Sequence, residues 1–271
     1  MLIHRIITGV IVFACLLALL FSGCNYLVLA VITVVFGLAS WECFRLFQLP
    51  TPKIIAAVWA LSLPLFIEFL PDASIYILGI CAVFWICIFI PALKTGLPKL
   101  KTGGSYFFLV TYSIAVFGLF LAIYLLYLRE PILLLSGICL VISADTGAYA
   151  FGRTMGKHKL AVSLSPSKTW EGAIGGWFVT LLLSVAVTFF SFFDKTFMSV
   201  SLAKFGWFGF ILIISFLFWI SVIGDLFESC LKRRAEIKDS SNLLPGHGGI
   251  LDRVDALMPV IPMTYLFTVF F

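Results

Sequence analysis

Four carboxylates near the C-terminal end of the chain are spaced so that they could share a metal ion. Asp225, Glu228 and Lys232 fall at positions i, i+3 and i+7, so they share one face if the segment is helical. Asp252 and Asp255 are likewise three residues apart, at the start of the last apolar run, where a helix N-terminus adds partial positive charge. If two helix ends bring these carboxylates together, a cation between them would relieve their repulsion. Oxygen ligands without a His and Cys cluster favour a hard ion, so we expect Mg²⁺, and a second cation is left open.

The residues around these carboxylates are typical of a phosphate site. Magnesium held by one or two carboxylates is usually completed by substrate phosphates. Two segments supply cationic donors and glycines that let the backbone approach a phosphate. They contain Lys232, Arg233, Arg234, Lys238, Arg253, Gly246, Gly248 and Gly249 in 226–254, and Arg153, Lys157, Lys159, Lys168, Gly152, Gly156 and Gly172 in 151–172. A polybasic loop that only attracts anionic lipid, at about 1 kcal/mol per charge, would explain the lysines but neither the glycines nor the carboxylates.

Other polar residues in apolar surroundings are weaker candidates. A carboxylate in a membrane helix is costly unless it is paired, hydrated or bound to metal, which makes Asp145 a functional candidate. For Glu42, beside Trp41, and for Glu68 we expect a position at the membrane interface without a role in the site. His247 stands between glycines, where it is either a turn residue or a phosphate donor; we expect it in the site and leave its role open.

The composition indicates an integral membrane protein. Of the 271 residues 62% are hydrophobic and 11% charged, 29 are Phe, and the mean hydropathy is +1.15. Each long apolar run must be a helix, because unpaired backbone amides are too costly in lipid. The runs are residues 6–21, 26–44, 54–70, 74–93, 106–127, 131–150, 173–193, 205–224 and 255–271. We therefore expect an all-α polytopic membrane protein with about nine transmembrane helices.

The basic residues support this count and predict the orientation. With the N-terminus in the cytoplasm, the non-cytoplasmic side holds only Arg129, Lys195 and Lys204. The cytoplasmic side holds the other 15 of the 18 Lys and Arg residues: Arg5, Arg45, Lys53, Lys94, Lys99, Lys101, Arg153, Lys157, Lys159, Lys168, Lys232, Arg233, Arg234, Lys238 and Arg253. The positive-inside rule gives such a split only when the number of crossings is right. It places the segments 151–172 and 226–254 together on the cytoplasmic side.

No internal repeat or linker defines a second domain. We expect a single integral membrane domain over residues 1–271, with N-terminal helices in 1–130 and catalytic helices and loops in 131–271. The first apolar run resembles a signal peptide, but similar runs continue along the chain, so we interpret it as a retained first helix.

The segment "SCLKRRAEIKDSSNLLPGHGGILDRVD", Ser229 to Asp255, lies near the C-terminal end of the chain. It fills every fixed position in the signature of the phosphatidate cytidylyltransferase (CDP-diacylglycerol synthase) family, which the sequence therefore resembles. The upstream "ADTGAYAFGR" and "SPSKTWEG" also look like family segments, so the resemblance covers about residues 140–258 closely. Members often carry Lys where Ser167 stands and Gly where Ser241 stands.

The resemblance implies that CTP and phosphatidate react to CDP-diacylglycerol and pyrophosphate, in phospholipid biosynthesis. It implies Asp225 and Asp252 as metal ligands. As catalytic residues we predict Asp225, Asp252, Lys232, Arg233 and Asp255, and as substrate-binding residues Asp145, Arg153, Lys168, Glu228, Lys238, Asp239, Gly246, His247, Gly248, Gly249 and Arg253. We expect CTP, phosphatidate and the lipid bilayer as partners and no nucleic acid, with the active site on the cytoplasmic face of a bacterial inner (plasma) membrane. The oligomeric state is left open, a homodimer included.

Two other functions are weighed against this one. A CTP-dependent lipid kinase would use similar metal and phosphate chemistry on a polyprenol or phytol. A transporter would also place carboxylates in helices, but typically near the bilayer midplane, and would not need a basic, glycine-rich loop.

Overall fold

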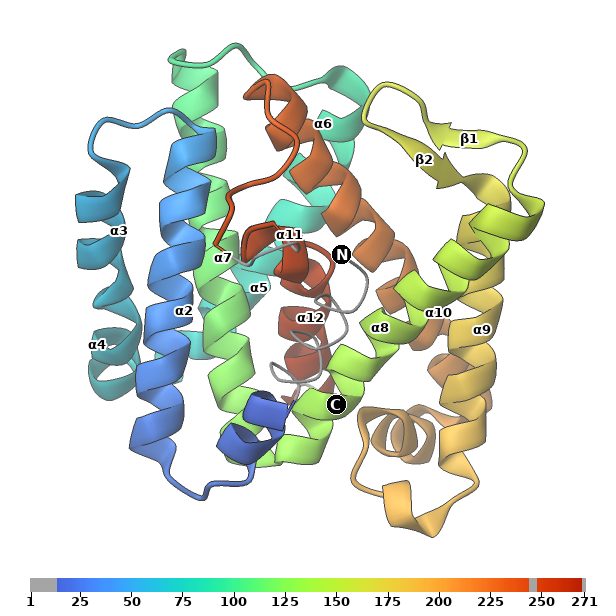
Figure 1. The fold of residues 1–271 in the computed structure, drawn as a ribbon. Helices are drawn as coiled ribbons and strands as arrows, with labels where there is room; N and C mark the ends of the chain where they lie inside the picture. Colours follow the sequence, from blue (N-terminus) through green and yellow to red (C-terminus); the bar gives the residue numbers. More distant parts are fainter. Residues whose placement is uncertain (1–13, 244–247, 270–271) are drawn as a thin grey trace.

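The computed structural model describes residues 14–243 and 248–269, which form a bundle of helices (Figure 1). The long helices are α2 (Asn25–Leu46), α7 (Gly103–Arg129), α8 (Pro131–Met155), α9 (Trp170–Thr188), α10 (Phe197–Arg234) and α12 (Leu257–Val269). The shorter elements are α3 (Pro52–Ala60), α4 (Ser62–Phe69), η1 (Pro71–Ala73), α5 (Ser74–Phe84), η2 (Trp85–Phe89), α6 (Ile90–Thr95), β1 (Lys159–Ala161), β2 (Ser165–Thr169), η3 (Ser191–Phe193) and α11 (Leu251–Val254). In Figure 1, α2 to α4 lie on one side, α9 and α10 on the other, and α12 between them.

Within the described residues, seven stretches of helix are long and apolar enough to cross a membrane. They correspond to the second through eighth apolar runs of the sequence. The first half of the first run lies outside the described residues, and the last run contains α12, an apolar helix of 13 residues. The chain is therefore an all-α polytopic membrane protein in its general architecture.

Helix α10 is longer than its apolar run and carries charge at its C-terminal end. It has 38 residues, begins after the N-cap Thr196, whose hydroxyl accepts the Ser199 amide, and is kinked at Gly206, where φ is 65°. The prediction of a shared helical face is confirmed, because the helix continues ten residues past the apolar run 205–224 and includes Asp225, Glu228 and Lys232. Phe227 anchors this region, with its ring 4.5 Å from that of Phe89 and 5.5 Å from that of Tyr112.

Helices α8 and α9 pack closely because glycines face each other across their contact. A Cβ on Gly172 would lie 2.8 Å from the Ala148 carbonyl oxygen, and one on Gly176 would lie 2.8 Å from that of Ala144. Neither position could hold a side chain without separating the helices. The Gly172 of the basic segment, expected to let a phosphate approach, thus has a packing role in the structure.

The segment between α8 and α9, expected to be a loop, forms a β-hairpin. Strands β1 and β2 are antiparallel, with Lys159 opposite Thr169 and Ala161 opposite Ser165. The sequence carries only a weak signal for it, because apolar and polar residues alternate from Val162 to Ser165 but Leu160, Ala161 and Val162 are consecutive apolar residues. The hairpin lies at the same end of the bundle as the C-terminus of α10 (Figure 1).

One polar contact at each end of the bundle shows which segments meet there. At one end, Arg233 donates to the Leu164 carbonyl oxygen of the hairpin at 3.3 Å. At the other end, Lys195 and Glu130 form an ion pair at 2.9 Å. The two basic segments of the sequence therefore meet at one end, as the charge distribution predicts.

Candidate active site

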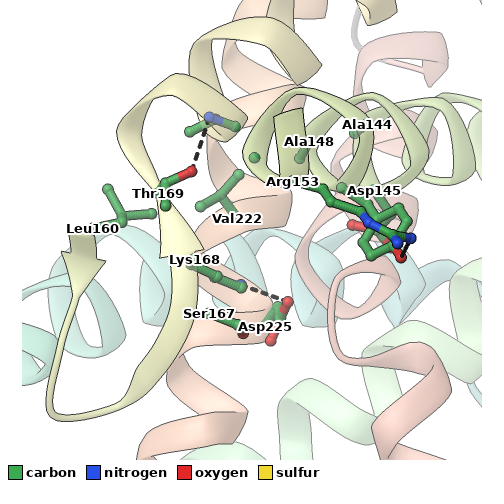
Figure 2. A pocket seen from close by; sticks show the side chains of 14 residues that line it. Ala144, Asp145, Ala148, Arg153, Leu160, Ser167, Lys168, Thr169, Val222 and Asp225 are labelled. Carbon is green, nitrogen blue, oxygen red and sulfur yellow. Dashed lines mark hydrogen bonds and ion pairs between the residues drawn. The ribbon is translucent and has the colours of Figure 1, made fainter. Parts of the chain in front are cut away.

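A cavity of about 440 Å³ opens between α8, α9, β2 and α10 (Figure 2). Its lining combines carboxylates with cationic groups: Asp145 and Arg153 come from α8, Lys168 from β2 and Asp225 from α10. Ala144, Ala148 and Val222 supply an apolar wall. The cavity can therefore receive an anionic group with an apolar part, and four of the predicted site residues meet in it.

An ion pair joins two sides of this cavity. The Lys168 ammonium lies 2.5 Å from Asp225 Oδ2, and Figure 2 shows both side chains pointing toward each other. Both side chains are partly exposed, at 23% and 30%. The Ser229 hydroxyl also donates to Asp225, at 3.4 Å. Lys168 and Asp225 are thus held by protein contacts and still accessible to a ligand.

The hairpin that carries Lys168 is fixed at its base by Glu171. This carboxylate accepts the backbone amides of Lys157 and His158 at 3.1 Å, and it lies 2.5 Å from His158 Nδ1. Thr169 caps α9 by accepting the Gly172 amide at 3.2 Å, as Figure 2 shows. These contacts set the position of β2, and with it that of Lys168.

A second cluster lies deeper, where α10 meets α11. Lys232 forms ion pairs with Glu228 and with Asp252, the latter with 2.6 Å between Nζ and Oδ1. The side chain of Glu228 is 0% exposed, that of Asp252 6% and that of Lys232 12%. Glu228 Oε1 has no hydrogen-bond partner among the described residues. The structure thus brings these predicted site residues together around one buried ammonium group.

Asp252 is held on both of its oxygens. Besides Lys232 on Oδ1, its Oδ2 accepts the Ser240 amide at 2.8 Å, the Ser240 hydroxyl at 2.9 Å and the Gly249 amide at 2.8 Å. Burial alone would raise the pKa of Asp252, but the hydrogen bonds from Lys232, Gly249 and Ser240 outweigh it and lower the pKa. Asp252 is therefore an anion at neutral pH.

Asp255 lies next to this cluster, and its pKa is shifted in the opposite direction to that of Asp252. Burial, together with the negative charges of Asp225 and Glu228, raises the pKa of Asp255 well above its usual value. Its Oδ1 accepts the Ala256 amide at 2.8 Å. A Cβ on Gly224 would collide with the Asp255 carbonyl oxygen and the ring of Pro259, so glycine is what lets α10 approach this segment. The carboxylates of α10 and of the 252–255 segment therefore come together, as their spacing predicts.

Glu42, for which the sequence predicts an interfacial position without a role, is instead buried and hydrogen-bonded to the segment that leads to Asp252. It is 0% exposed and accepts four hydrogen bonds from the segment that carries Asp252. Its Oε1 accepts from the Ser241 hydroxyl at 2.5 Å and the Ile250 amide at 3.0 Å. Its Oε2 accepts from the Ser240 hydroxyl at 3.1 Å and the Leu251 amide at 2.7 Å. The expectation of an interfacial position for Glu42 is wrong, because its side chain is fully buried. Its hydrogen-bond partners lie about 200 residues away in the sequence.

The remaining predicted residues lie around this centre or outside the described residues. Gly246 and His247 fall among the residues that the structure does not describe. Gly248 has φ of 86°, which glycine adopts without strain. A Cβ on Gly249 would collide with Glu42 and Ser240, so packing against these two side chains requires a glycine at this position. Three others are exposed: Lys238, Asp239 and Arg253.

The donor set can be compared with what magnesium requires. Within residues 14–243 and 248–269, no group of three or more His, Cys, Asp or Glu side chains is close enough to hold a metal ion. Magnesium needs only one or two carboxylates, since water and phosphate complete its shell. Asp225 at the cavity and Asp252, whose Oδ1 faces the Lys232 ammonium, fit such a cation chemically, and the unpartnered Oε1 of buried Glu228 belongs to the same cluster as Asp252. In the structure, the ammonium groups of Lys168 and Lys232 balance these carboxylates.

Comparisons with known proteins agree on one family. Among relatives, the chain is 44% identical over 148 residues to "Phosphatidate cytidylyltransferase" of Haemophilus influenzae, covering 53% of this chain and 49% of the relative. It is 48% identical over 119 residues to the protein of the same name from Staphylococcus aureus strain COL, covering 44% and 42%. It is 42% identical over 134 residues to that of Bacillus subtilis, covering 49% and 46%.

The matched part of the chain thus spans about half the length of these curated relatives, or somewhat less. The model of the cytidylyltransferase family, in contrast, matches residues 3–271. Because this match includes α2 with Glu42 as well as the C-terminal signature, the chain belongs as a whole to the cytidylyltransferase family.

Proposed function

We propose that this protein transfers the cytidylyl group of CTP to phosphatidate, giving CDP-diacylglycerol and pyrophosphate for phospholipid biosynthesis. The observation that carries the proposal is the cavity in which Lys168 and Asp225 meet at 2.5 Å beside Arg153. A cation and a carboxylate that are partly exposed and face one another can exchange partners with an incoming phosphate and its metal ion. The family and the names of the relatives support the same reaction.

In the proposed reaction, an oxygen of the lipid phosphate attacks the α-phosphorus of CTP. A new phosphorus–oxygen bond forms, the bond to the bridging oxygen of the β-phosphate breaks, and pyrophosphate leaves. No covalent intermediate with the protein is needed. The protein contributes position and charge: Lys168 and Arg153, which line the cavity, orient the phosphates, and Lys232 in the cluster with Asp252 offsets their negative charge.

We propose Mg²⁺ as the cofactor, held by Asp225 and Asp252. When bound, magnesium neutralises phosphate charge and polarises the phosphoryl oxygens. Glu228, buried with one unpartnered oxygen, would add negative charge to this site. Lys168 and Lys232, which balance these carboxylates in the structure, would then be available to the substrate phosphates.

The reaction is tested by its products. Purified protein in micelles of an uncharged detergent should convert phosphatidate and CTP into CDP-diacylglycerol and equimolar pyrophosphate, measured by mass spectrometry and an enzymatic pyrophosphate assay. The same mixture without phosphatidate should release none. Conversion of CTP to CDP, together with a lipid that has gained one phosphate, would instead indicate a lipid kinase.

We further propose that the site faces the cytoplasm of a bacterial inner membrane. In a cysteine-free background, Ser163→Cys in the hairpin and Asn242→Cys after α10 should react with a membrane-impermeant maleimide only after the cells are opened. Asp194→Cys, in the loop at the other end of the bundle, is the matched control and should react in intact cells. All three positions are exposed. If Ser163→Cys and Asn242→Cys react from opposite sides, the predicted alternation of helices is wrong.

A further inference from the structure

The carboxylate of Glu42 occupies a position that only a side chain with two acceptor oxygens can fill. Each of its oxygens accepts two hydrogen bonds, one from a serine hydroxyl and one from a backbone amide. A glutamine in the same place would direct its NH₂ group at a backbone N–H, which cannot accept a hydrogen bond, because an amide has a single acceptor oxygen. A fully buried carboxylate is tolerated only when its hydrogen-bonding capacity is satisfied, as it is here.

These four bonds connect two stretches of chain that are separated in sequence. Ser240 and Ser241 follow α10, whereas Ile250 and Leu251 lead into α11, which carries Asp252. Glu42 itself belongs to α2, in the N-terminal half of the chain. The contact therefore fixes the start of α11 against a helix that has no residue in the cavity lining.

Ser240 links Glu42 directly to the buried cluster. Its hydroxyl lies 3.1 Å from Glu42 Oε2 and 2.9 Å from Asp252 Oδ2, and its amide also donates to Asp252. Since a hydroxyl has only one proton, the two carboxylates share it, and the position of either carboxylate depends on the other. Asp252 in turn binds Lys232. A continuous path thus runs from Glu42 through Ser240 and Asp252 to Lys232.

Gly249 gives independent support for a fixed geometry. A Cβ at this position would collide with the Ser240 hydroxyl and with Glu42 Oε1, so the glycine is fitted to the carboxylate of α2. The amide of Gly249 donates to Asp252 at 2.8 Å from the same place. Both carboxylates therefore hold this backbone from two sides.

We propose that Glu42 is a positioning residue of the cytidylyl-transfer site, which acts by holding Asp252 and Lys232 in place through Ser240 and the backbone at 249–251. The proposal rests on the proposed function for its kinetic part. Glu42 does not line the cavity, and in the proposed role it contacts no substrate. Its loss should consequently displace Asp252 and Lys232 without removing any group that binds CTP.

The kinetic test compares Glu42→Gln and Glu42→Asp with Glu68→Gln, the matched control at an exposed glutamate of α4. Glu42→Gln should lower kcat by about 10- to 100-fold per folded molecule, the usual effect of removing a residue that orients an active-site ligand. The KM for CTP should change by less than about threefold, because the interaction lost is one that acts in the transition state. Glu42→Asp keeps both acceptor oxygens and should retain more activity than Glu42→Gln, and Glu68→Gln should match the wild type.

A second variant, Ser240→Ala, tests the same positioning role if Glu42→Gln does not fold. Ser240→Ala removes only the shared hydroxyl, and it should lower kcat in the same direction. Where both fold, the combined variant should lose less than the product of the two single effects, because both substitutions break one path. Independent effects that multiply in full would contradict the path through Ser240.

Cleavage by trypsin tests the positioning role of Glu42 independently of cytidylyl transfer. Trypsin can cleave after the exposed Lys238, just before Ser240. Glu42→Gln should accelerate this cleavage in native protein, with cleavage of the wild type and of Glu68→Gln slow and equal. If the wild type transfers no cytidylyl group but cleavage accelerates in Glu42→Gln, the positioning role holds and the proposed function fails. Unchanged cleavage together with unchanged kcat in folded Glu42→Gln would overturn the inference.

Discussion

Asp225→Asn should insert and fold like the wild type and lose cytidylyl transfer by at least about a hundredfold, the scale on which one key electrostatic contact acts. The asparagine keeps the shape of the side chain and one acceptor oxygen but removes the charge that we expect to hold magnesium. The folded protein should lose little stability, because the ion pair of Asp225 with Lys168 is partly exposed and worth at most about 1 kcal/mol. Turnover is measured at saturating Mg²⁺ and CTP, and stability by thermal unfolding in detergent.

Two variants control this experiment. Asp194→Asn changes an exposed aspartate at the other end of the bundle and should leave turnover unchanged. Lys168→Gln removes the other half of the ion pair; if Lys168 contacts a phosphate in the transition state, its turnover falls as well. Near-wild-type turnover of Asp225→Asn would exclude Asp225 as a metal ligand.

Lys232→Met should have the largest combined effect on stability and activity. The substitution leaves Glu228 and Asp252 buried next to each other without the cation between them, and loss of one partner from a buried ion pair costs about 3–5 kcal/mol. We therefore expect a lower unfolding temperature together with a loss of turnover. Lys204→Met, at an exposed lysine of α10, is the matched control and should change neither.

The double variant Lys232→Met/Glu228→Gln distinguishes the two roles of Lys232. Neutralising Glu228 removes the unpaired buried charge, so most of the lost stability should return. Turnover should remain at least about a hundredfold below the wild type, because the charge that Lys232 supplies to the phosphates is still missing. If the double variant regains wild-type turnover, Lys232 is needed only to fold the protein.

The site could be predicted from the sequence where it depends on local spacing. Asp225, Glu228 and Lys232 follow the helical period, and α10 confirms their common face. The sequence predicts a shorter helix than α10, because hydropathy identifies only the part of a helix that contacts lipid. Helix α10 continues beyond residue 224, with its charged residues packed against the protein. The hairpin at 159–169 is not predicted, because apolar and polar residues alternate strictly only from Val162 to Ser165 and Leu160, Ala161 and Val162 are consecutive apolar residues.

The burial of Glu42 could not be predicted from its local sequence. Its neighbours Trp41 and Arg45 suggest an interfacial side chain, and Arg45 does lie over the Trp41 ring, at 5.8 Å. The four donors to its carboxylate all come from residues 240–251, so its burial depends on tertiary packing alone. The packing role of Gly249 could not be predicted for the same reason, since one of the two side chains that its Cβ would meet lies on α2.

The most direct test of cytidylyl transfer follows the phosphates of CTP separately. Purified protein is incubated with phosphatidate and Mg²⁺ and with CTP labelled at either the α- or the γ-phosphate, and the lipids are separated by thin-layer chromatography, with Asp225→Asn in parallel. We expect α-label in the lipid product, γ-label in pyrophosphate, and almost no labelled lipid with Asp225→Asn. Appearance of the γ-label in lipid, or of no label in lipid with wild-type protein, would contradict it.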